Sequence, residues 1–349
     1  MSERLVVLDA DVLGRRRTGD ESYVENLLRE LAGLPRGFRL AAVARAPELL
    51  PPGVEPHVLP AQSQLLRMGL RLPSLLGRLR PDLSHFLHVV PARTHGHVVL
   101  TVQDLSFERR PELMSPRDRL LFRTLVPRSV KRADRILVGS EWTRTDLVER
   151  YGAPEEKVVV TPYGVDPHFG ATGPTRNTAP YLLVVGALQP RKDPVRALEA
   201  LALLDSELRL VFAGPGKGST SDLRDGVRRL RLEPRVEIAG YVDKDELASL
   251  YRGAACLVFP SLYEGFGLPM VEAMASGTPV VATTAGALPE VAGEAAILVE
   301  PGDAEALAAG VERALSQRER LVAAGLERSR RFSWADTARR TIAVYEELL

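Results

Sequence analysis

Short apolar runs alternate along the whole chain with stretches whose apolar positions recur at helical spacing. The runs are too short for buried helices and are bounded by glycine, proline or polar residues, which predicts buried strands. They lie at residues 5–8, 98–102, 136–138, 158–160, 181–185, 208–213, 236–238, 256–259 and 280–282. Strands that alternate with helical segments predict an α/β fold built on parallel sheets.

The helical segments present their apolar faces at spacings of three and four residues. Tyr23, Leu27 and Leu31, for example, line one face of a helix expected over residues 21–31. Further helices are expected over residues 117–131, 141–151, 195–204, 270–275, 304–316 and 318–331. Polar residues suited to cap a helix N-terminus precede three helical segments, namely Ser140, Asp243 and Ser333.

The length of the chain favours two domains. At 349 residues, two domains can each bury a core of their own. Residues 167–180 contain Gly, Pro, Thr and Asn without periodicity, which is typical of a linker. The sequence therefore predicts a first domain over residues 1–166, a second over 181–332 and a final helix within 333–349.

Composition and charge exclude several classes of protein. Apolar content of 45% with 26% charged residues is ordinary for a globular protein, and a net charge of +1 argues against a dedicated nucleic-acid binder. The single cysteine, Cys256, excludes an internal disulfide and suits a reducing compartment. Neither a signal peptide nor an apolar run of membrane-spanning length is present. A cytoplasmic monomer or weak dimer is therefore expected.

One stretch carries the most specific chemistry. The apolar run 256–259 is followed by a glycine-bearing loop, 264–268, and then by a helix that ends at Gly277. A strand, a glycine-rich loop and a helix N-terminus form an anion site, because unpaired N–H groups point into one space. Glu264 and Glu272 would repel phosphate and are better suited to accept hydrogen bonds from hydroxyls. Phosphate and hydroxyls together indicate a sugar nucleotide, while an ordinary buried crossover with a glycine turn is the alternative.

A second motif follows the first strand of the second domain. Gly186 would let the backbone approach a ligand closely, and Arg191 and Lys192 place two cations before the helix expected over 195–204. Gly214 ends the run 208–213 and is expected in a turn near the nucleotide. Together with the loop at Glu264, this motif supplies both halves of a nucleotide-sugar site.

The spacing of Glu264 and Glu272 resembles the E-x7-E signature of the family-4 retaining glycosyltransferases, and the resemblance extends over nearly the whole chain. Within that family the chain is most similar to the bacterial mannosyltransferase B-like branch used in O-antigen and capsule assembly. The resemblance implies a GT-B fold, in which two Rossmann-like domains with doubly wound parallel sheets face each other across a cleft. It also implies that the final helix returns to the first domain.

The resemblance assigns roles to residues of the second domain. Arg191 and Lys192 would hold the diphosphate and stabilise it as it leaves, so that no metal or other cofactor is required. Glu264 would bind the sugar near its 3-hydroxyl, and Glu272 the ribose hydroxyls. The remaining donor-binding positions implied by the resemblance are Gly186, Gly214, Tyr241, Val242, Phe266, Gly267 and Leu268.

In the first domain, the resemblance places the acceptor side at the loop ending near Gly19 and at His85, His88 and Asp104. Gln103 stands where the family usually has a histidine near the donor sugar. An amide can bond a sugar hydroxyl but cannot carry a proton or a charge. Four histidines lie within thirteen residues, which raises the alternative of a zinc site. The sequence flanking them offers neither cysteine nor a matching carboxylate, so no metal is expected. The four are His85, His88, His95 and His97.

Residues 65–79 alternate leucines with arginines and so have a basic amphipathic character. Such a segment can lie on an anionic membrane. Pro73 interrupts it, which favours an exposed helix with one face on the core. Peripheral contact with the inner face of a membrane stays open as the alternative.

These observations predict a retaining glycosyltransferase. It would transfer an α-linked mannose or glucose from a donor of the GDP-mannose or UDP-glucose type to a glycan or a lipid-linked acceptor. Two alternatives remain: a catalytically weak or silent subunit that binds nucleotide sugars, and a GT-B epimerase or phosphorylase. Gln103 weakens the epimerase alternative, because that reaction needs acid and base groups around the anomeric carbon.

Overall fold

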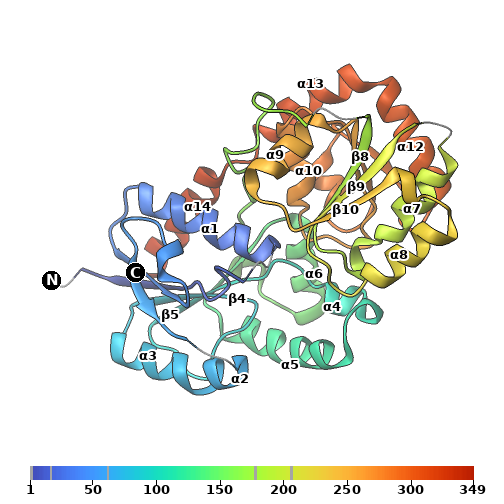
Figure 1. Ribbon diagram of the computed structural model, residues 1–349. Helices are drawn as coiled ribbons and strands as arrows, with labels where there is room; N and C mark the ends of the chain where they lie inside the picture. The colour runs from blue at the N-terminus through green and yellow to red at the C-terminus, as the bar shows by residue number, and fades with distance from the viewer. Residues whose placement is uncertain (1–2, 16–17, 61–62, 177–178, 205–206) are drawn as a thin grey trace. The chain divides into compact units, whose positions relative to one another are not determined.

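Two parallel β-sheets, each formed by a different part of the chain, organise the computed structural model (Figure 1). The structure describes residues 3–15, 18–60, 63–176, 179–204 and 207–349. The chain divides into unit 1, Met1–Gly164 with Ser333–Leu349, and unit 2, Val165–Phe332. Residues 16–17 of the loop before Gly19 and residues 177–178 of the expected linker lie outside the described residues.

The sheet of unit 1 has seven parallel strands over the described residues, in the order β3-β2-β1-β4-β5-β6-β7. The strands are β1 (Leu5–Asp9), β2 (Arg39–Ala44), β3 (Glu55–Val58), β4 (Leu83–Leu87), β5 (His97–Thr101), β6 (Arg135–Val138) and β7 (Val158–Val160). The chain moves outward from β1 in one direction through β2 and in the other through β4. This reversal creates a switch point, and ligands of such sheets bind beside the carboxyl ends of the strands there.

The helices of unit 1 cover both faces of its sheet. They are α1 (Thr18–Gly33), α2 (Gln64–Leu66), α3 (Leu72–Leu79), α4 (Ser106–Arg109), α5 (Pro116–Arg132), α6 (Glu141–Tyr151) and α14 (Trp334–Leu348). The connection through α1 runs from β1 towards the β3 edge of the sheet, whereas the connections through α3, α5 and α6 run towards the β7 edge. Because such crossovers are right-handed, α1 lies on one face and α3, α5 and α6 lie on the other. The helix α14 packs beside α1 (Figure 1).

The sheet of unit 2 has six parallel strands over the described residues, in the order β10-β9-β8-β11-β12-β13. The strands are β8 (Tyr181–Val185), β9 (Arg209–Ala213), β10 (Val236–Gly240), β11 (Cys256–Phe259), β12 (Val280–Thr283) and β13 (Ile297–Val299). The helices are α7 (Pro194–Leu203), α8 (Thr220–Arg229), α9 (Lys244–Gly253), α10 (Leu268–Ala275), α11 (Leu288–Ala292), α12 (Ala304–Ser316) and α13 (Arg318–Ser329). The switch point of this sheet lies between β8 and β11.

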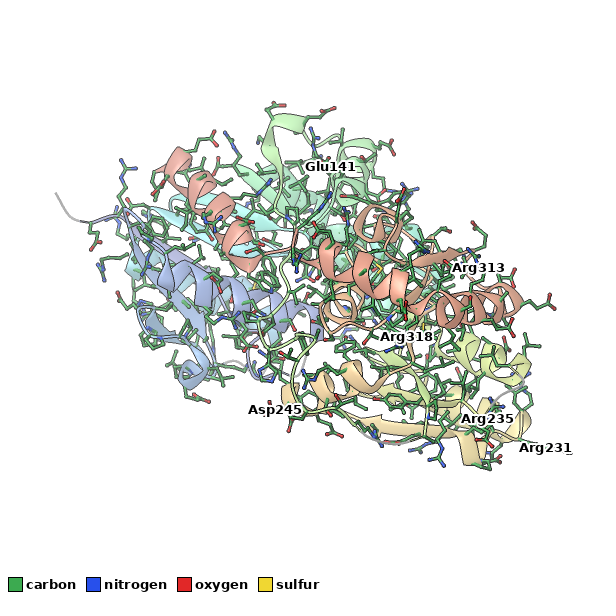
Figure 2. The ribbon with its side chains drawn as sticks, turned by 90° about the horizontal axis from the view of Figure 1, so that it is seen from above. Glu141, Arg231, Arg235, Asp245, Arg313 and Arg318 are labelled. Carbon is green, nitrogen blue, oxygen red and sulfur yellow. The ribbon has the colours of Figure 1, made fainter. Side chains whose placement is uncertain are left out.

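Two arginines stabilise the amino ends of strands in unit 2, at the edge of the sheet away from its switch-point loops. These arginines are Arg235 and Arg318, both labelled in Figure 2. The guanidinium of Arg235 donates to the carbonyl of Leu208, 3.0 Å away, and that of Arg318 donates to the carbonyl of Ala255 at 2.7 Å. Leu208 immediately precedes β9, and Ala255 immediately precedes β11. The arginines therefore satisfy backbone groups that the sheet itself leaves without a partner.

The expected α/β fold with two doubly wound sheets is confirmed, as are the caps. The side chains of Ser140, Asp243 and Ser333 accept hydrogen bonds from the N–H groups of Thr143, Glu246 and Asp336. The strands β2, β3, β4 and β13 were not predicted.

The segment expected as a linker belongs to unit 2. Arg252 donates to the carbonyl of Pro174 at 2.7 Å, and Arg176 pairs with Glu237 at 2.8 Å. At the other end of the chain, α14 belongs to unit 1, where Trp334 stacks on Tyr163 with ring centroids 5.8 Å apart. The final helix was expected to return to the first domain, but these individual residue pairs could not be predicted, since they join residues far apart in the chain.

The basic leucine segment keeps its helical course through Pro73. A π-helical turn, Arg67–Arg71, separates α2 from α3, and Pro73 lies in the first turn of α3. Proline lacks the N–H that would bond to the preceding turn, and widening that turn accommodates it. Leu72, Leu75 and Leu76 are buried on the core, as the helix-on-core interpretation predicted. Among the described residues, no helix is both long enough and apolar enough to cross a membrane.

Candidate functional site

The carboxyl ends of β8 and β9 meet backbone against backbone in unit 2. Gly214 has a φ of +150°, and a Cβ added there would lie 2.1 Å from the carbonyl oxygen of Gly186. The N–H of Gly186 donates to Ala213 at 2.9 Å, and the N–H of Gly214 donates to Gly240 at 2.7 Å. A side chain at position 214 would force these strands apart, so the close approach requires glycine. The ends of β8 and β9 therefore present backbone, without side chains at Gly186 and Gly214, beside the switch point.

The most concentrated charge of this edge is a cluster formed by Arg191, Lys192 and Glu264. One oxygen of Glu264 lies 2.5 Å from the ammonium of Lys192, and the other lies 3.0 Å from the guanidinium of Arg191. Ser261 donates to the first oxygen at 2.5 Å. The two cations follow β8 and the carboxylate follows β11, so neighbouring strands at the switch point bring the two predicted motifs together.

Burial and charge compete at Glu264, whose residue is only 5% exposed. Burial alone would raise the pKa of its carboxyl, but Lys192 and Arg191 outweigh burial and hold that pKa below its usual value. Glu264 is therefore ionised at neutral pH and accepts hydrogen bonds rather than giving up a proton. Lys192 is oriented further by the ring of Phe259, whose centroid lies 5.0 Å from its ammonium.

The loop after Glu264 is shaped by two glycines in the left-handed region. Gly267, with φ of +101°, stands at the N-cap of α10, and a Cβ there would come 2.6 Å from Leu288. Gly286, with φ of +66°, leaves no room for a Cβ, which would lie 2.2 Å from the carbonyl oxygen of Glu264. Ala287 donates to that carbonyl at 2.9 Å. The first-turn N–H groups of α10 thus begin directly after the charged cluster.

Glu272, on α10, has the opposite environment to Glu264. Burial raises the pKa of its carboxyl to about 7, although Tyr251 donates a hydrogen bond to it at 2.8 Å. Asp166 lies near enough to raise the pKa further, and Lys244, which pairs with Asp166 at 3.0 Å, lowers it. Tyr251 could not be recognised from the sequence, because its position on α9 follows the ordinary apolar spacing of a helix.

The remaining donor-side positions contribute mainly backbone. Phe266 is buried and packs edge to face against Phe332, with ring centroids 5.4 Å apart, so its side chain belongs to the core. Leu268 begins α10 and is partly exposed. Tyr241 and Val242 follow β10, where the ring of Tyr241 is exposed and Val242 is partly exposed. At these predicted donor positions, the backbone groups of the loops are therefore the features available to a ligand.

In unit 1, loops after β1, β4 and β5 meet at the carboxyl edge of the sheet. Gly19 lies in the first turn of α1, and a Cβ added there would lie 3.6 Å from Oε1 of Gln103. The amide Nε2 of Gln103 is buried and has no hydrogen-bond partner among the described residues. His88 has φ of +57°, and its Nε2 lies 3.2 Å from Asp20. A buried amide donor without a partner is a feature that a ligand oxygen could satisfy.

Asp104 and the other histidines have partners within unit 1. The carboxylate of Asp104 accepts the N–H of Ser106 at 2.9 Å, which shapes the turn after Gln103. His95 bonds to the carbonyl of Pro81 at 3.1 Å, and His97 faces Asp134 at 3.5 Å. No group of three His, Cys, Asp or Glu residues in the described part of the chain is arranged to hold a metal ion.

The expected acceptor-side role of His85 is wrong. Its residue is 0% exposed, and its two ring nitrogens lie 2.5 Å from the hydroxyl of Tyr345 and 2.7 Å from that of Thr101. Burial lowers the pKa of the imidazole to about 3, so it is neutral. The reason is that β4 is an inner strand of a sheet covered on both faces, so a residue on it points into a core. His85 is a structural residue that ties α14 to the sheet.

Two family models match the chain in sequence. The one described as "Glycosyl transferases group 1" matches residues 171–331, and the one described as "Glycosyltransferase Family 4" matches residues 17–169. Together they span most of unit 2 and unit 1.

Individual proteins are similar as well. The chain is 32% identical over 268 residues to an O-antigen chain mannosyltransferase B of Escherichia coli, and the match covers 72% of this chain and 70% of that protein. A D-inositol 3-phosphate glycosyltransferase of Kineococcus radiotolerans is 36% identical over 250 residues, which covers 62% of this chain and 58% of the relative. The chain therefore matches less than two thirds of the length of the second relative.

A solved structure shares the fold. The crystal structure of Anabaena HepE in complex with UDP and glucose superposes with a TM-score of 0.78 over 99% of this chain and 100% of that chain, at 19% sequence identity. Similarity at this identity shows a common arrangement of helices and strands. The chemistry of this chain has to be argued from its own residues.

Proposed function

The chain belongs to the family-4 glycosyltransferases with the GT-B fold, and on this premise we propose that it is a retaining enzyme that needs no metal. It transfers an α-linked hexose, mannose or glucose, from a nucleotide-diphosphate sugar to a glycan or a lipid-linked acceptor. The mannosyltransferase and HepE comparisons support such a donor, since the first relative is named for mannose transfer and the second was solved with UDP and glucose.

The observation that carries this proposal is the ion cluster of Arg191, Lys192 and Glu264. The cluster contains two positive charges and one negative charge, so it keeps an excess positive charge beside the N-terminus of α10. Cations fixed in advance by a buried carboxylate stabilise the negative charge that develops on a departing diphosphate, without reorganising during the reaction. This is the contribution that a divalent cation makes in metal-dependent transferases.

The two glutamates bind the donor through its hydroxyls. Glu264 is ionised and accepts hydrogen bonds from the sugar, near its 3-hydroxyl. Glu272, beside the phenol of Tyr251, accepts hydrogen bonds from the ribose. In the reaction, the bond from the anomeric carbon to the diphosphate breaks while a bond to the acceptor oxygen forms on the same face. The departing phosphate oxygen takes the acceptor's proton, so no base from the protein is required.

Gln103 supplies a buried amide donor, Nε2, that has no hydrogen-bond partner among the described residues. Its amide binds a hydroxyl or carbonyl oxygen of the bound sugars, in the place where the family usually has a histidine. An amide holds a hydroxyl in position but does not titrate, so the transfer rate should not depend on a charge at this position. We assign Gln103 to the donor sugar near its anomeric carbon, and Gly19, His88 and Asp104 to the acceptor.

The experiment begins with a thermal-shift panel of GDP-mannose, UDP-glucose, UDP-GlcNAc, UDP-galactose and ADP-glucose, first without metal and then with magnesium. A preferred donor at 100 times its Kd should stabilise the fold by about 2.7 kcal/mol. Metal-free kinetics with that donor then compare the wild type with Lys192→Ala, for which kcat should fall by about 100-fold with little change in donor KM.

The control is Lys157→Ala, which removes a lysine of unit 1 whose ammonium donates to the carbonyl of Ala133 at 3.2 Å. Its kcat should stay near that of the wild type. A Lys192→Ala enzyme with unchanged kcat would remove the leaving-group assignment. Donor binding without hydrolysis or transfer to any acceptor would favour the silent binding subunit, and release of sugar phosphate driven by inorganic phosphate would favour a phosphorylase.

A further inference from the structure

The outward side of α5 carries leucines and basic residues in one stripe. Leu120, Leu121, Arg128 and Lys131 follow Arg117 by three, four, eleven and fourteen residues, and all five are exposed. At 3.6 residues per turn, such spacings keep side chains on one side of a helix. Leu120 is 70% exposed and Leu121 is 38% exposed. The opposite side of α5 packs into the core through buried Val126 and Val130.

A second group of exposed leucines lies on the helical segment that precedes β4. Leu65 and Leu70 are each 66% exposed, and Leu66 lies between them at 41%. The segment also carries exposed Arg71 and Arg78. Here too apolar side chains and cations share the solvent-facing side of a helix whose other side is buried.

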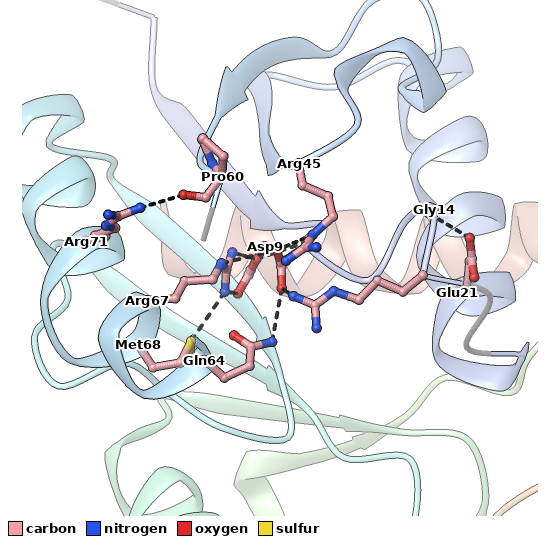
Figure 3. A network of polar contacts seen from close by, with 11 residues as sticks. Asp9, Gly14, Glu21, Arg45, Pro60, Gln64, Arg67, Met68 and Arg71 are labelled. Atoms are coloured by element: carbon pink, nitrogen blue, oxygen red, sulfur yellow. Dashed lines mark hydrogen bonds and ion pairs between the residues drawn. The ribbon is translucent and has the colours of Figure 1, made fainter. Parts of the chain in front are cut away.

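The leucines are held in this orientation by a buried ion pair. Arg67, which is only 2% exposed, points inward from the π-helical turn and bonds to both carboxylate oxygens of Asp9 at the end of β1 (Figure 3). Gln64 donates to Asp11 at 3.0 Å from the same side. With Arg67 directed inward, Leu65, Leu66 and Leu70 of the same helical segment remain exposed. The exposure is thus a consequence of the fold.

Both leucine groups lie on the same face of the sheet of unit 1. The helices α3 and α5 pack on one shared core, and the loop between β4 and β5 contacts the elements on both sides. Ala92 donates its N–H to the carbonyl of Met68 at 3.1 Å, and Arg132 donates to the carbonyl of Pro91 at 2.6 Å. In Figure 1, α2, α3 and α5 follow one edge of unit 1.

We propose that this surface, defined as Leu65, Leu66, Leu70, Leu120 and Leu121 with the cations Arg71, Arg78, Arg117, Arg128 and Lys131, docks the protein on an anionic lipid bilayer. Exposed leucines scattered singly are common, but leucines flanked by cations on helices lying along one face match the chemistry of a membrane interface. The leucines enter the headgroup region while the guanidinium and ammonium groups bind lipid phosphates.

Charge complementarity favours lipid over a second copy of the chain. The whole chain has a net charge of only +1, yet this surface carries five cations. The stripe on α5 contains no acidic residue. Exposed acids close to these segments in sequence are Asp118, to the side of the stripe on α5, Glu112, in the turn before α5, and Asp82, in the turn after α3. Two copies facing each other through this surface would bring like charges together.

The test is co-sedimentation of the full chain with vesicles of phosphatidylcholine alone and with phosphatidylglycerol. Binding is expected only to the anionic vesicles and should weaken as salt is raised. Leu70→Ser with Leu120→Ser, and separately Arg128→Glu with Lys131→Glu, should each lower the lipid partition coefficient by at least about tenfold. Matched controls on unit 2, Leu203→Ser and Arg229→Glu, change an exposed leucine and an exposed arginine and should leave binding unchanged.

Each variant is also checked for thermal unfolding and for donor binding, neither of which should change, because these side chains are exposed and lie on unit 1. Equal sedimentation with neutral and anionic vesicles would overturn the proposal. So would unchanged binding in both double variants. Sedimentation-velocity data that show a dimer lost in the same variants would instead assign the surface to contact between copies. The donor readout is independent, so failure here leaves the proposed reaction in place.

Discussion

Glu264 and Glu272 show how one residue type takes two protonation states eight positions apart. Both carboxyls are shielded from water, which by itself raises a carboxyl pKa. At Glu264 two cations reverse that effect, whereas at Glu272 the hydrogen bond from Tyr251 is too weak to do so. Glu264 is therefore charged at neutral pH, whereas Glu272 changes its protonation state near neutral pH. The two residues are therefore expected to respond differently to pH.

Donor binding should depend on pH through Glu272. Its pKa is raised to about 7, so the carboxyl is half protonated near neutrality, and only the ionised form accepts hydrogen bonds with both oxygens. Affinity for an intact nucleotide-diphosphate sugar should therefore rise by up to about tenfold from pH 6 to pH 8, since bonds to a charged acceptor are the stronger ones. Titration calorimetry in two buffers of different ionisation enthalpy should show proton release on binding.

The matched variant is Glu272→Gln, which keeps the shape of the side chain and removes its titration. Its donor affinity should be lower and flat across the same range, with no proton release. The free energy of unfolding of the unliganded protein should instead fall as the pH rises. A carboxyl whose pKa is raised in the folded state stabilises it below pH 4.5, the ordinary value, and loses that contribution as pH rises towards 7. An affinity that is flat with pH in the wild type would contradict the role of Glu272.

At the scale of elements, a buried ion pair joins the helical segment before β4 to the end of β1. The carboxylates of Asp9 and Asp11 lie around the guanidinium of Arg67, and Arg45 approaches Asp11 at 3.3 Å (Figure 3). Burial disfavours the charge of Arg67, but Asp9 and Asp11 hold its pKa above the usual value. A polar contact of this kind fixes which side of the segment faces inward, which apolar packing alone would leave less specific.

Arg67→Met should therefore destabilise unit 1 strongly. Methionine fills much of the space but leaves Asp9 buried without its partner, which typically costs about 3–5 kcal/mol. Denaturant unfolding of Arg67→Met, Asp9→Asn and the double variant forms a double-mutant cycle, and the double variant should lose less than the sum of the two. Arg71→Met, an exposed neighbour, is the control and should change the unfolding free energy by about 0.5 kcal/mol or less. Additive losses would show that the pair is not coupled.

At the scale of the whole molecule, elements with a strong apolar pattern were predicted from the sequence. Elements with a weak apolar pattern were missed. The helices expected over residues 141–151 and 304–316 were found with those bounds as α6 and α12, because caps and apolar spacing agree there. The strand β2, with sequence RLAAVA, is rich in alanine and lacks the β-branched composition that marks a strand. The strand β4 contains Ser84, which donates to the carbonyl of His95 before β5, and His85, whose partners lie in β5 and α14.

The candidate site was predictable where its residues are neighbours in sequence. Glu264 and the Arg191–Lys192 pair each stand in a local motif, and parallel strand order then brings the motifs together. Tyr251 and the pair of Asp166 with Lys244 were missed, because they reach Glu272 only through tertiary packing. His85 was misplaced for the same reason. Position within a motif predicts proximity to a site, but burial depends on the elements that cover each face.

Unit 2 should fold and bind the donor without unit 1. A fragment of residues 165–332 contains a complete core cluster and the predicted donor residues Arg191, Lys192, Glu264 and Glu272. Its ends meet, since Val165 donates its N–H to the carbonyl of Phe332 at 3.1 Å. We expect cooperative thermal unfolding, a rise in Tm with the donor that stabilises the full chain, and no sugar transfer, because Gln103 and His88 are absent. The same fragment with Lys192→Ala should fold and lose most of the Tm rise, whereas a fragment that folds but ignores every donor would place the donor contacts outside this unit.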